Sequence, residues 1–131
     1  MLIIYWITRL VAALILLQTL FFKFTAAEES VYIFTTVGME PWGRIGVGIF
    51  EFIAAILLII PATAWMGGIL ALGLMLGAIG MHLTILGIEV KGDGGYLFGL
   101  ALAVTLCSVF VVWRNAGSII SFVSAIRKRF N

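Results

Sequence analysis

Four ionisable residues lie in stretches of this sequence that are otherwise almost entirely apolar. They are Arg9, Lys23, Glu51 and His82. A charged side chain at the centre of a bilayer costs about 2.5–3.5 kcal/mol on insertion scales, so such residues are usually paired or face a polar cavity. Histidine adds a group that exchanges protons near neutral pH. The first chemistry that the sequence indicates is therefore a polar site inside an apolar protein.

The composition indicates the solvent in which this site lies. The chain has 131 residues, of which 63% are hydrophobic and 11% are charged, and its mean hydropathy is +1.23. Soluble domains carry about 25% charged and 45–50% apolar residues. A single soluble domain of this length could not bury so much apolar surface, so we expect residues 1–131 to form one integral membrane domain whose partner is the lipid bilayer.

The elements that position the four residues follow from the apolar segments. A spanning helix needs about 20 mostly apolar residues, and four segments meet or approach this length. The expected spans are residues 2–22, 44–60, 65–86 and 96–113. The segment between the first two is too polar to span, and we expect a short interfacial helix from Glu28 and a turn at Pro41. The fold class predicted is an all-α, four-helix membrane bundle. We do not expect a cleaved signal peptide, since no positive charge precedes the first apolar run.

The distribution of Lys and Arg predicts the orientation, because connections rich in these residues stay cytoplasmic. The C-terminal segment holds four of them, and five of the six acids fall in the opposite connections. We therefore expect a multi-pass membrane protein with both termini cytoplasmic. Residues 117–130 have apolar positions at helical spacing, which predicts an amphipathic helix on the membrane surface. Its basic end would contact anionic headgroups through Arg127, Lys128 and Arg129.

Helical periodicity places each buried charge on a face of small residues, where helices approach each other rather than lipid. At a rise of about 1.5 Å per residue, Glu51 and His82 lie in the outer half of the bundle with Lys23, whereas Arg9 lies roughly 10 Å from the inner end of its span. Arg9 can then reach Glu51 only by extending along the bundle.

Two interpretations follow for this group. In the structural one, Arg9 and Glu51 form an internal ion pair that fixes helix register, and His82 is hydrogen-bonded nearby. In the functional one, Glu51, His82 and Lys23 line a polar pocket open to the outer leaflet, which binds a lipid headgroup or a quinone ring, or relays protons. A bundle this small is expected to leave little room for a large cavity. The two interpretations are compatible with each other.

Other residues have simpler expected roles. Gly73, Gly77 and Gly80 predict close helix packing, either within the chain or between copies through Gly73 and Gly77. Gln18 lies off the charged face and could contact a neighbouring helix or a second subunit, and Cys107 is expected to be a packing residue. The sequence contains no metal-binding or nucleotide-binding motif, and no feature that suggests a nucleic-acid partner.

The charged positions resemble those of the DoxX and DoxX-like family of small four-helix membrane proteins. The resemblance is carried by "RLVAALILLQTLFFK" from Arg9 to Lys23, by "GVGIFE" ending at Glu51, and by "LALGLMLGAIGMHL" with His82 near its end. Two departures are that Gln18 and Thr19 replace a glycine usual in the first helix, and that the final span lacks a Gly-rich, acidic ending.

The resemblance implies a four-helix bundle in a bacterial inner membrane, with Arg9, Lys23, Glu51 and His82 as its polar positions. It also implies an accessory component of a quinone-linked or thiol-linked membrane redox system rather than an independent enzyme. Quinone is then the ligand to expect. The alternative is a non-catalytic assembly factor or chaperone for another membrane protein. A transporter is disfavoured, because the four spans show no inverted repeat.

Overall fold

The protein is all-helical in a computed structural model that describes residues 2–131. Over these residues the α-helices are α1 (Leu2–Phe24), α2 (Glu28–Thr36), α3 (Trp42–Ile59), α4 (Ala64–Met81), α5 (Tyr96–Arg114) and α6 (Ala116–Phe130). A 3₁₀ turn over Pro61–Thr63 (η1) joins α3 to α4, and a π-helical turn over His82–Leu86 (η2) continues α4. This confirms the predicted fold class, including the short helix after the first span and the C-terminal helix.

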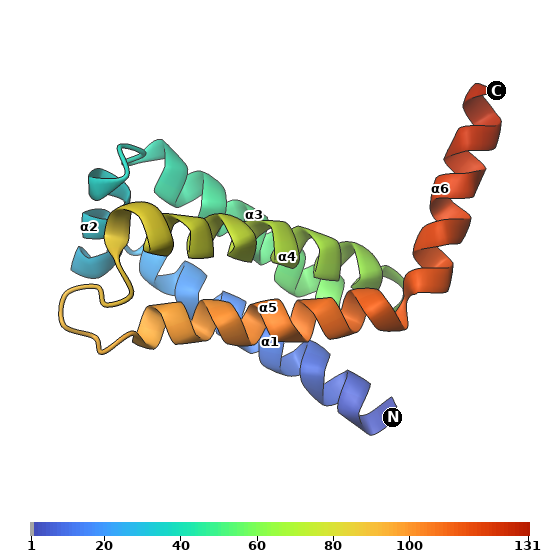
Figure 1. The fold of residues 1–131 in the computed structure, drawn as a ribbon, viewed down its shortest axis with the longest axis horizontal. Helices are drawn as coiled ribbons and strands as arrows, with labels where there is room; N and C mark the ends of the chain where they lie inside the picture. The colour runs from blue at the N-terminus through green and yellow to red at the C-terminus, as the bar shows by residue number, and fades with distance from the viewer. Residues whose placement is uncertain (1) are drawn as a thin grey trace.

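The four long helices form a bundle in which α1 and α4 each pack against both α3 and α5. The short helix α2 and the loop between η2 and α5 lie at one end of the bundle, which we call the α2 end (Figure 1). The N-terminus and α6 lie at the other end, the α6 end, where α6 turns away from the bundle (Figure 1). Each end therefore gathers residues from several helices that are distant in the sequence.

The outer surface of the bundle is that of a membrane protein. Four segments are long and apolar enough to cross a membrane, and these are Leu2–Phe24, Trp42–Ile59, Pro61–Leu86 and Tyr96–Arg114. Large apolar side chains face outward along them, such as Leu14, which is 65% exposed, and Leu106, which is 72% exposed. An apolar surface of this extent requires lipid as its solvent. The chain is therefore a multi-pass membrane protein, and the predicted spans differ from the observed ones by only a few residues.

The interior is built from small residues. Alanine supplies seven of the twelve residues of the core cluster, at positions 12, 13, 54, 55, 64, 71 and 101, together with Leu16, Leu58, Met75, Val104 and Val111. Helix α4 packs closely against its neighbours near the α6 end. A Cβ added at Gly67 would lie 2.7 Å from the backbone nitrogen of Leu58, and one added at Gly68 would lie 3.0 Å from Val111. These two glycines let α4 approach α3 and α5 without side chains between them.

The end of α3 depends on Pro61. Proline has no backbone N–H, so it cannot donate to the carbonyl of Leu57 one turn earlier. The hydroxyl of Thr63 donates to that carbonyl instead, over 3.0 Å. The next two carbonyls, of Leu58 and Ile59, accept bonds from the side chain of Arg9. The break between the second and third spans therefore creates acceptors that another helix must satisfy.

Candidate functional site

A cavity of about 550 Å³ occupies the α2 end of the bundle. Residues of α1, α2, α3, α4, η2 and α5 line it, and most of them are apolar. The polar or ionisable ones are Gln18, Thr19, Lys23, Glu29, Ser30, Glu51, His82 and Tyr96. The expectation that so small a bundle leaves little room for a large cavity is therefore wrong. Small residues of α4, Gly73, Gly77 and Ala78, contribute to the space, although Leu74, Met75 and Met81 of the same helix also line it.

Lys23 and Glu51 form an ion pair on the wall of this cavity. Lys23 Nζ lies 3.1 Å from Glu51 Oε1, and the two side chains are 15% and 3% exposed. A lysine near a helix end usually extends toward the membrane interface, so its inward direction here requires a buried partner. The second carboxylate oxygen, Oε2, lies 3.1 Å from the hydroxyl of Thr19, which also lies 3.0 Å from the carbonyl of Leu16. One hydroxyl proton thus serves two acceptors.

The predicted ion pair between Arg9 and Glu51 is absent among the described residues. Arg9 lies in the half of α1 toward the α6 end, and its Nε and Nη2 donate to the carbonyls of Leu58 and Ile59, each over 2.7 Å. The prediction failed because helical periodicity gives the face of a residue but not which partner on the neighbouring helix lies at its depth. Lys23 is the cation at the depth of Glu51. Arg9 instead binds the carbonyls of Leu58 and Ile59, which are free because α3 ends there.

Arg9 is nevertheless the most deeply buried charge in the described bundle, at 1% exposure. Its guanidinium stacks on the rings of Trp6 and Tyr5, with 4.2 and 5.1 Å to the centroids. The C-terminal end of a helix carries a partial negative charge, which favours a cation at the end of α3. Arg9 therefore caps α3 and has no place in the lining of the cavity.

His82 lies on the opposite side of the cavity, at the start of the π-helical turn, and is 6% exposed. Its Nδ1 is 2.9 Å from the carbonyl oxygen of Gly87, and its ring meets Phe98 edge-on. A carbonyl oxygen only accepts, so Nδ1 carries the proton and the lone pair of neutral His82 is on Nε2. Nε2 makes no hydrogen bond with another described residue, so it is free to accept one from a ligand.

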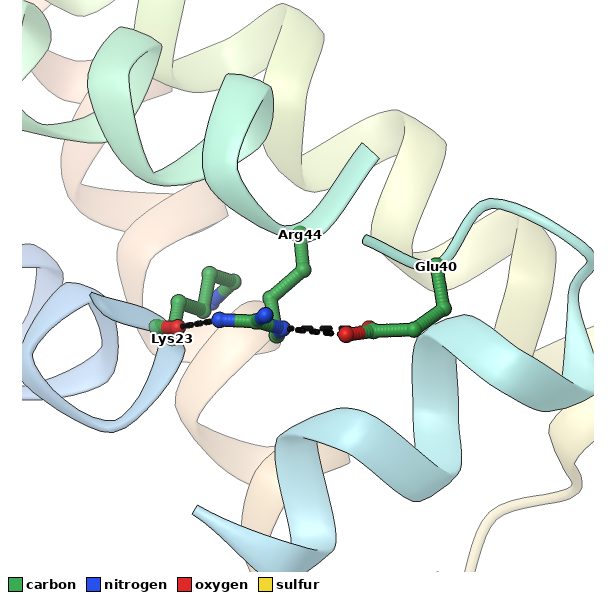
Figure 2. Close-up of polar contacts among 3 residues, drawn as sticks. All are labelled: Lys23, Glu40 and Arg44. Carbon is green, nitrogen blue, oxygen red and sulfur yellow. Dashed lines mark hydrogen bonds and ion pairs between the residues drawn. The ribbon is translucent and has the colours of Figure 1, made fainter. Parts of the chain in front are cut away.

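Arg44 is a buried polar residue that the sequence analysis did not single out. Its Nε donates to both carboxylate oxygens of Glu40, over 2.8 and 3.0 Å, and its Nη1 donates to the backbone carbonyl of Lys23 (Figure 2). Arg44 therefore caps α1 in the way that Arg9 caps α3. The four-residue spacing of Glu40 and Arg44 was the available signal. Thr19, one turn before Lys23, was missed in the same way.

Glycines on α4 do not all have the predicted role. A Cβ added at Gly73, Gly77 or Gly80 would have no neighbour within 4 Å, so these residues mediate no close packing within the chain. Gly73 and Gly77 instead line the cavity, and so does Gln18. The expectation of close packing within the chain is wrong for this motif, because α4 approaches its neighbours closely only at Gly67 and Gly68.

The loop before α5 is held by Asp93, whose carboxylate accepts backbone N–H bonds from Val90, Gly95 and Leu97 over 3.0, 2.8 and 3.2 Å. Burial alone would raise the pKa of Asp93, but these three donors and nearby His82 lower it below its ordinary value. A second tie crosses from this loop to α2, where Lys91 Nζ lies 3.0 Å from Glu28 Oε1. Both ties hold the loop over the cavity end of the bundle.

The basic residues Arg127, Lys128 and Arg129 are exposed in the last turn of α6. This helix makes one aromatic contact with the bundle, between Phe122 and Trp65, whose ring centroids are 5.1 Å apart. Within residues 2–131, no group of three or more His, Cys, Asp or Glu side chains is arranged to hold a metal ion. Comparison with known proteins adds no further assignment, since no family model, curated protein or solved structure matches the chain.

Proposed function

We propose that this multi-pass membrane protein binds a lipid-soluble small molecule with a polar head in the cavity at the α2 end. The observation that carries the proposal is the cavity itself, whose lining is apolar except at a few positions that include the Lys23–Glu51 pair and His82. Small-molecule sites are typically 300–1,000 Å³ in volume, mostly apolar, and contain a few polar groups that orient the ligand. About 550 Å³ falls within that range.

The polar groups favour a neutral head that both donates and accepts hydrogen bonds. Lys23 and Glu51 compensate each other, so the pair leaves no net charge to attract an ion. The ammonium of Lys23 can donate to a carbonyl, and Nε2 of His82 can accept from a hydroxyl. A quinone ring and its reduced quinol form present these groups. The apolar lining suits the tail of such a molecule.

The resemblance of the charged positions to the DoxX-like pattern also supports a ligand site in the cavity, and it suggests a more specific function. Three of its four polar positions, Lys23, Glu51 and His82, line the cavity, and the fourth, Arg9, caps α3. We therefore propose an accessory component of a quinone-linked or thiol-linked membrane redox system. Glu51 and His82 would hydrogen-bond the head of the ligand, and Lys23 would add an electrostatic contact.

The test is mass spectrometry of the organic extract from purified wild type and a Glu51→Gln variant. We expect a quinone or a defined lipid in stoichiometric amount with the wild type and its loss from Glu51→Gln. The matched control is Glu89→Gln, the same chemical change in the loop outside the cavity, which should retain the ligand. A wild type that carries nothing, combined with a low melting temperature for Glu51→Gln, would assign Glu51 a structural role only.

A second candidate function is that of a non-catalytic assembly factor for another membrane protein. It is supported by the exposed face of α4, where Gly73 and Gly77 have no neighbour that an added Cβ would meet. A second copy of the chain could use the same face. Purification with one stable membrane partner and without a small molecule would favour this function over ligand binding.

The charge distribution supports an orientation with the α6 end in the cytoplasm. Arg114 and the basic turn of α6 lie there, whereas the acids of the connecting segments, Glu28, Glu29, Glu40, Glu89 and Asp93, belong to the α2 end. With this orientation α6 would lie on the cytoplasmic leaflet. In a Cys107→Ser background, a membrane-impermeant thiol reagent should label Lys91→Cys from outside intact cells and should not label Ser124→Cys.

A further inference from the structure

The cavity is covered at the end of the bundle that would meet water. Residues of α2 line it, and Phe34 and Ser30 anchor this helix at 4% and 9% exposure. Lys91, in the loop before α5, forms an ion pair with Glu28 of α2 and lies 5.1 Å from the centroid of the Tyr32 ring. A ligand dissolved in the aqueous phase would have to displace this cover.

On α4 the wall of the cavity includes two residues without side chains. Gly73 and Gly77 line the cavity and are exposed, and an added Cβ at either residue meets no atom within 4 Å, so an opening to the outer surface at this point of α4 would have no side chain across it. The third span covers Pro61–Leu86, so Gly73 lies at its middle. Such an opening is thus at the depth of the hydrocarbon core, where acyl chains rather than water are the solvent.

The polar groups of the cavity lie nearer the α2 end than this opening. Gly73 and His82 are nine residues apart, which is about 14 Å along a helix axis. His82 is 6% exposed, and its Nε2 has no hydrogen-bond partner among the described residues. A ligand that satisfies Nε2 while its apolar part reaches the opening must therefore be elongated.

We propose that the ligand enters sideways from the bilayer through the opening at Gly73 and Gly77, and that its apolar tail remains in this opening while its head binds near Glu51 and His82. The inference rests on the proposed ligand-binding function and adds a class of ligand to it. That class is a membrane-dissolved molecule with a hydrogen-bonding head and an apolar tail, whose head and tail together are longer than about 14 Å, the distance that nine helical residues span.

Access is tested with an aryl diazirine dissolved in the bilayer of proteoliposomes, photolysed and mapped by mass spectrometry. Carbene insertion needs no bound ligand, so the result is independent of the identity of the ligand. In the wild type we expect adducts on Leu100, Ala101 and Val104, three of the α5 residues that line the cavity. Gly77→Leu should reduce these adducts at least fivefold by filling the opening.

The matched control is Gly80→Leu, the same substitution one turn further along α4. Gly80 has no atom within 4 Å of an added Cβ either, and it does not line the cavity. It should leave the adducts on α5 unchanged. If Gly77→Leu does not fold, Gly73→Leu replaces it. A wild type without cavity adducts, or equal labelling of Gly77→Leu and wild type, would overturn the proposed route.

The ligand class is tested with a benzoquinone that carries a decyl tail and with the same ring without a tail. We expect Gly77→Leu to weaken binding of the tailed compound at least tenfold and to leave the tailless one unchanged. Equal losses for both compounds would contradict a tail in the opening. If the wild type binds neither compound but its cavity is labelled from the bilayer, the quinone proposal fails and the route remains.

Discussion

The two ends of this bundle use the same residue types for different purposes. At the α6 end, Gly67 and Gly68 bring helices into close contact, and Arg9 binds only backbone carbonyls. Further along α4, Gly73 and Gly77 have no atom within 4 Å of an added Cβ, and they border the cavity that occupies the α2 end. The basic residues there are paired with carboxylates, Lys23 with Glu51 and Arg44 with Glu40.

The difference shows that a buried arginine or a glycine motif does not by itself indicate function in a membrane protein. Arg9 and Arg44 each satisfy a helix C-terminus, which in lipid has no water to bind its free carbonyls. Lys23 is different, because its side chain forms an ion pair with Glu51 on the wall of the cavity and does not cap a helix end. We therefore infer that the α6 end supplies stability and that the α2 end supplies the proposed ligand site.

The largest expected loss of stability is at the α6 end. Arg9→Met leaves the carbonyls of Leu58 and Ile59 without their donors, at about 1–3 kcal/mol for each unsatisfied buried acceptor. We expect the free energy of unfolding in bicelles to fall by roughly 2–6 kcal/mol. Arg127→Met, on exposed α6, should change it by less than about 0.5 kcal/mol. Equal stability of Arg9→Met and wild type would contradict the capping role.

The next largest expected loss of stability is at the α2 end. Lys23→Met leaves Glu51 buried without its counter-ion, and breaking a buried ion pair costs about 3–5 kcal/mol. The double variant Lys23→Met/Glu51→Met should recover most of this loss, because replacing both partners by apolar residues is often neutral. It should not recover ligand binding. A double-mutant cycle of unfolding free energies measures the coupling, and additive effects would argue against a direct pair.

A smaller loss of stability is expected when alanine replaces a closely packed glycine of α4 than when a buried charge loses its partner. No loss is expected at a glycine of α4 that has no close neighbour. Gly67→Ala forces a methyl group to within 2.7 Å of a backbone nitrogen of α3, and overpacking of this kind costs about 1–3 kcal/mol. Gly80→Ala meets no atom and should not lower stability. Thermal unfolding of the two variants, which carry the same change on the same helix, gives the comparison. Similar melting temperatures would remove the distinction between the ends.

The smallest effect concerns the loop over the cavity. Because the pKa of Asp93 is lowered in the folded protein, its contribution to stability is present above the ordinary aspartate pKa and is lost as pH falls through the lowered value. We expect hydrogen-exchange protection of the Gly95 and Leu97 amides to be constant near neutral pH and to fall in that acidic window. Asp93→Asn should show low protection that no longer depends on pH. An unchanged profile would show that other contacts hold the loop.

Much of the fold was predictable from the sequence because it depends on local properties. Apolar length predicted the four spans and the break between the second and third, the polarity of the segment between the first two spans predicted α2, and helical spacing predicted α6. For the site, the sequence predicted that Lys23, Glu51 and His82 lie in the same half of the bundle. It did not predict the partner of Arg9 or the roles of Thr19 and Arg44, because these depend on contacts between helices.

The sequence by itself therefore determined that this chain folds as a helical bundle in lipid with a few ionisable residues inside it. Both facts follow from composition and periodicity, which act within single helices. Only the tertiary structure decided which charges meet, which glycines pack and where the cavity lies. These depend on how the helices cross and on the depth at which their side chains become neighbours. A shift of one turn, about 5.4 Å, would exchange one partner for another without changing any helix.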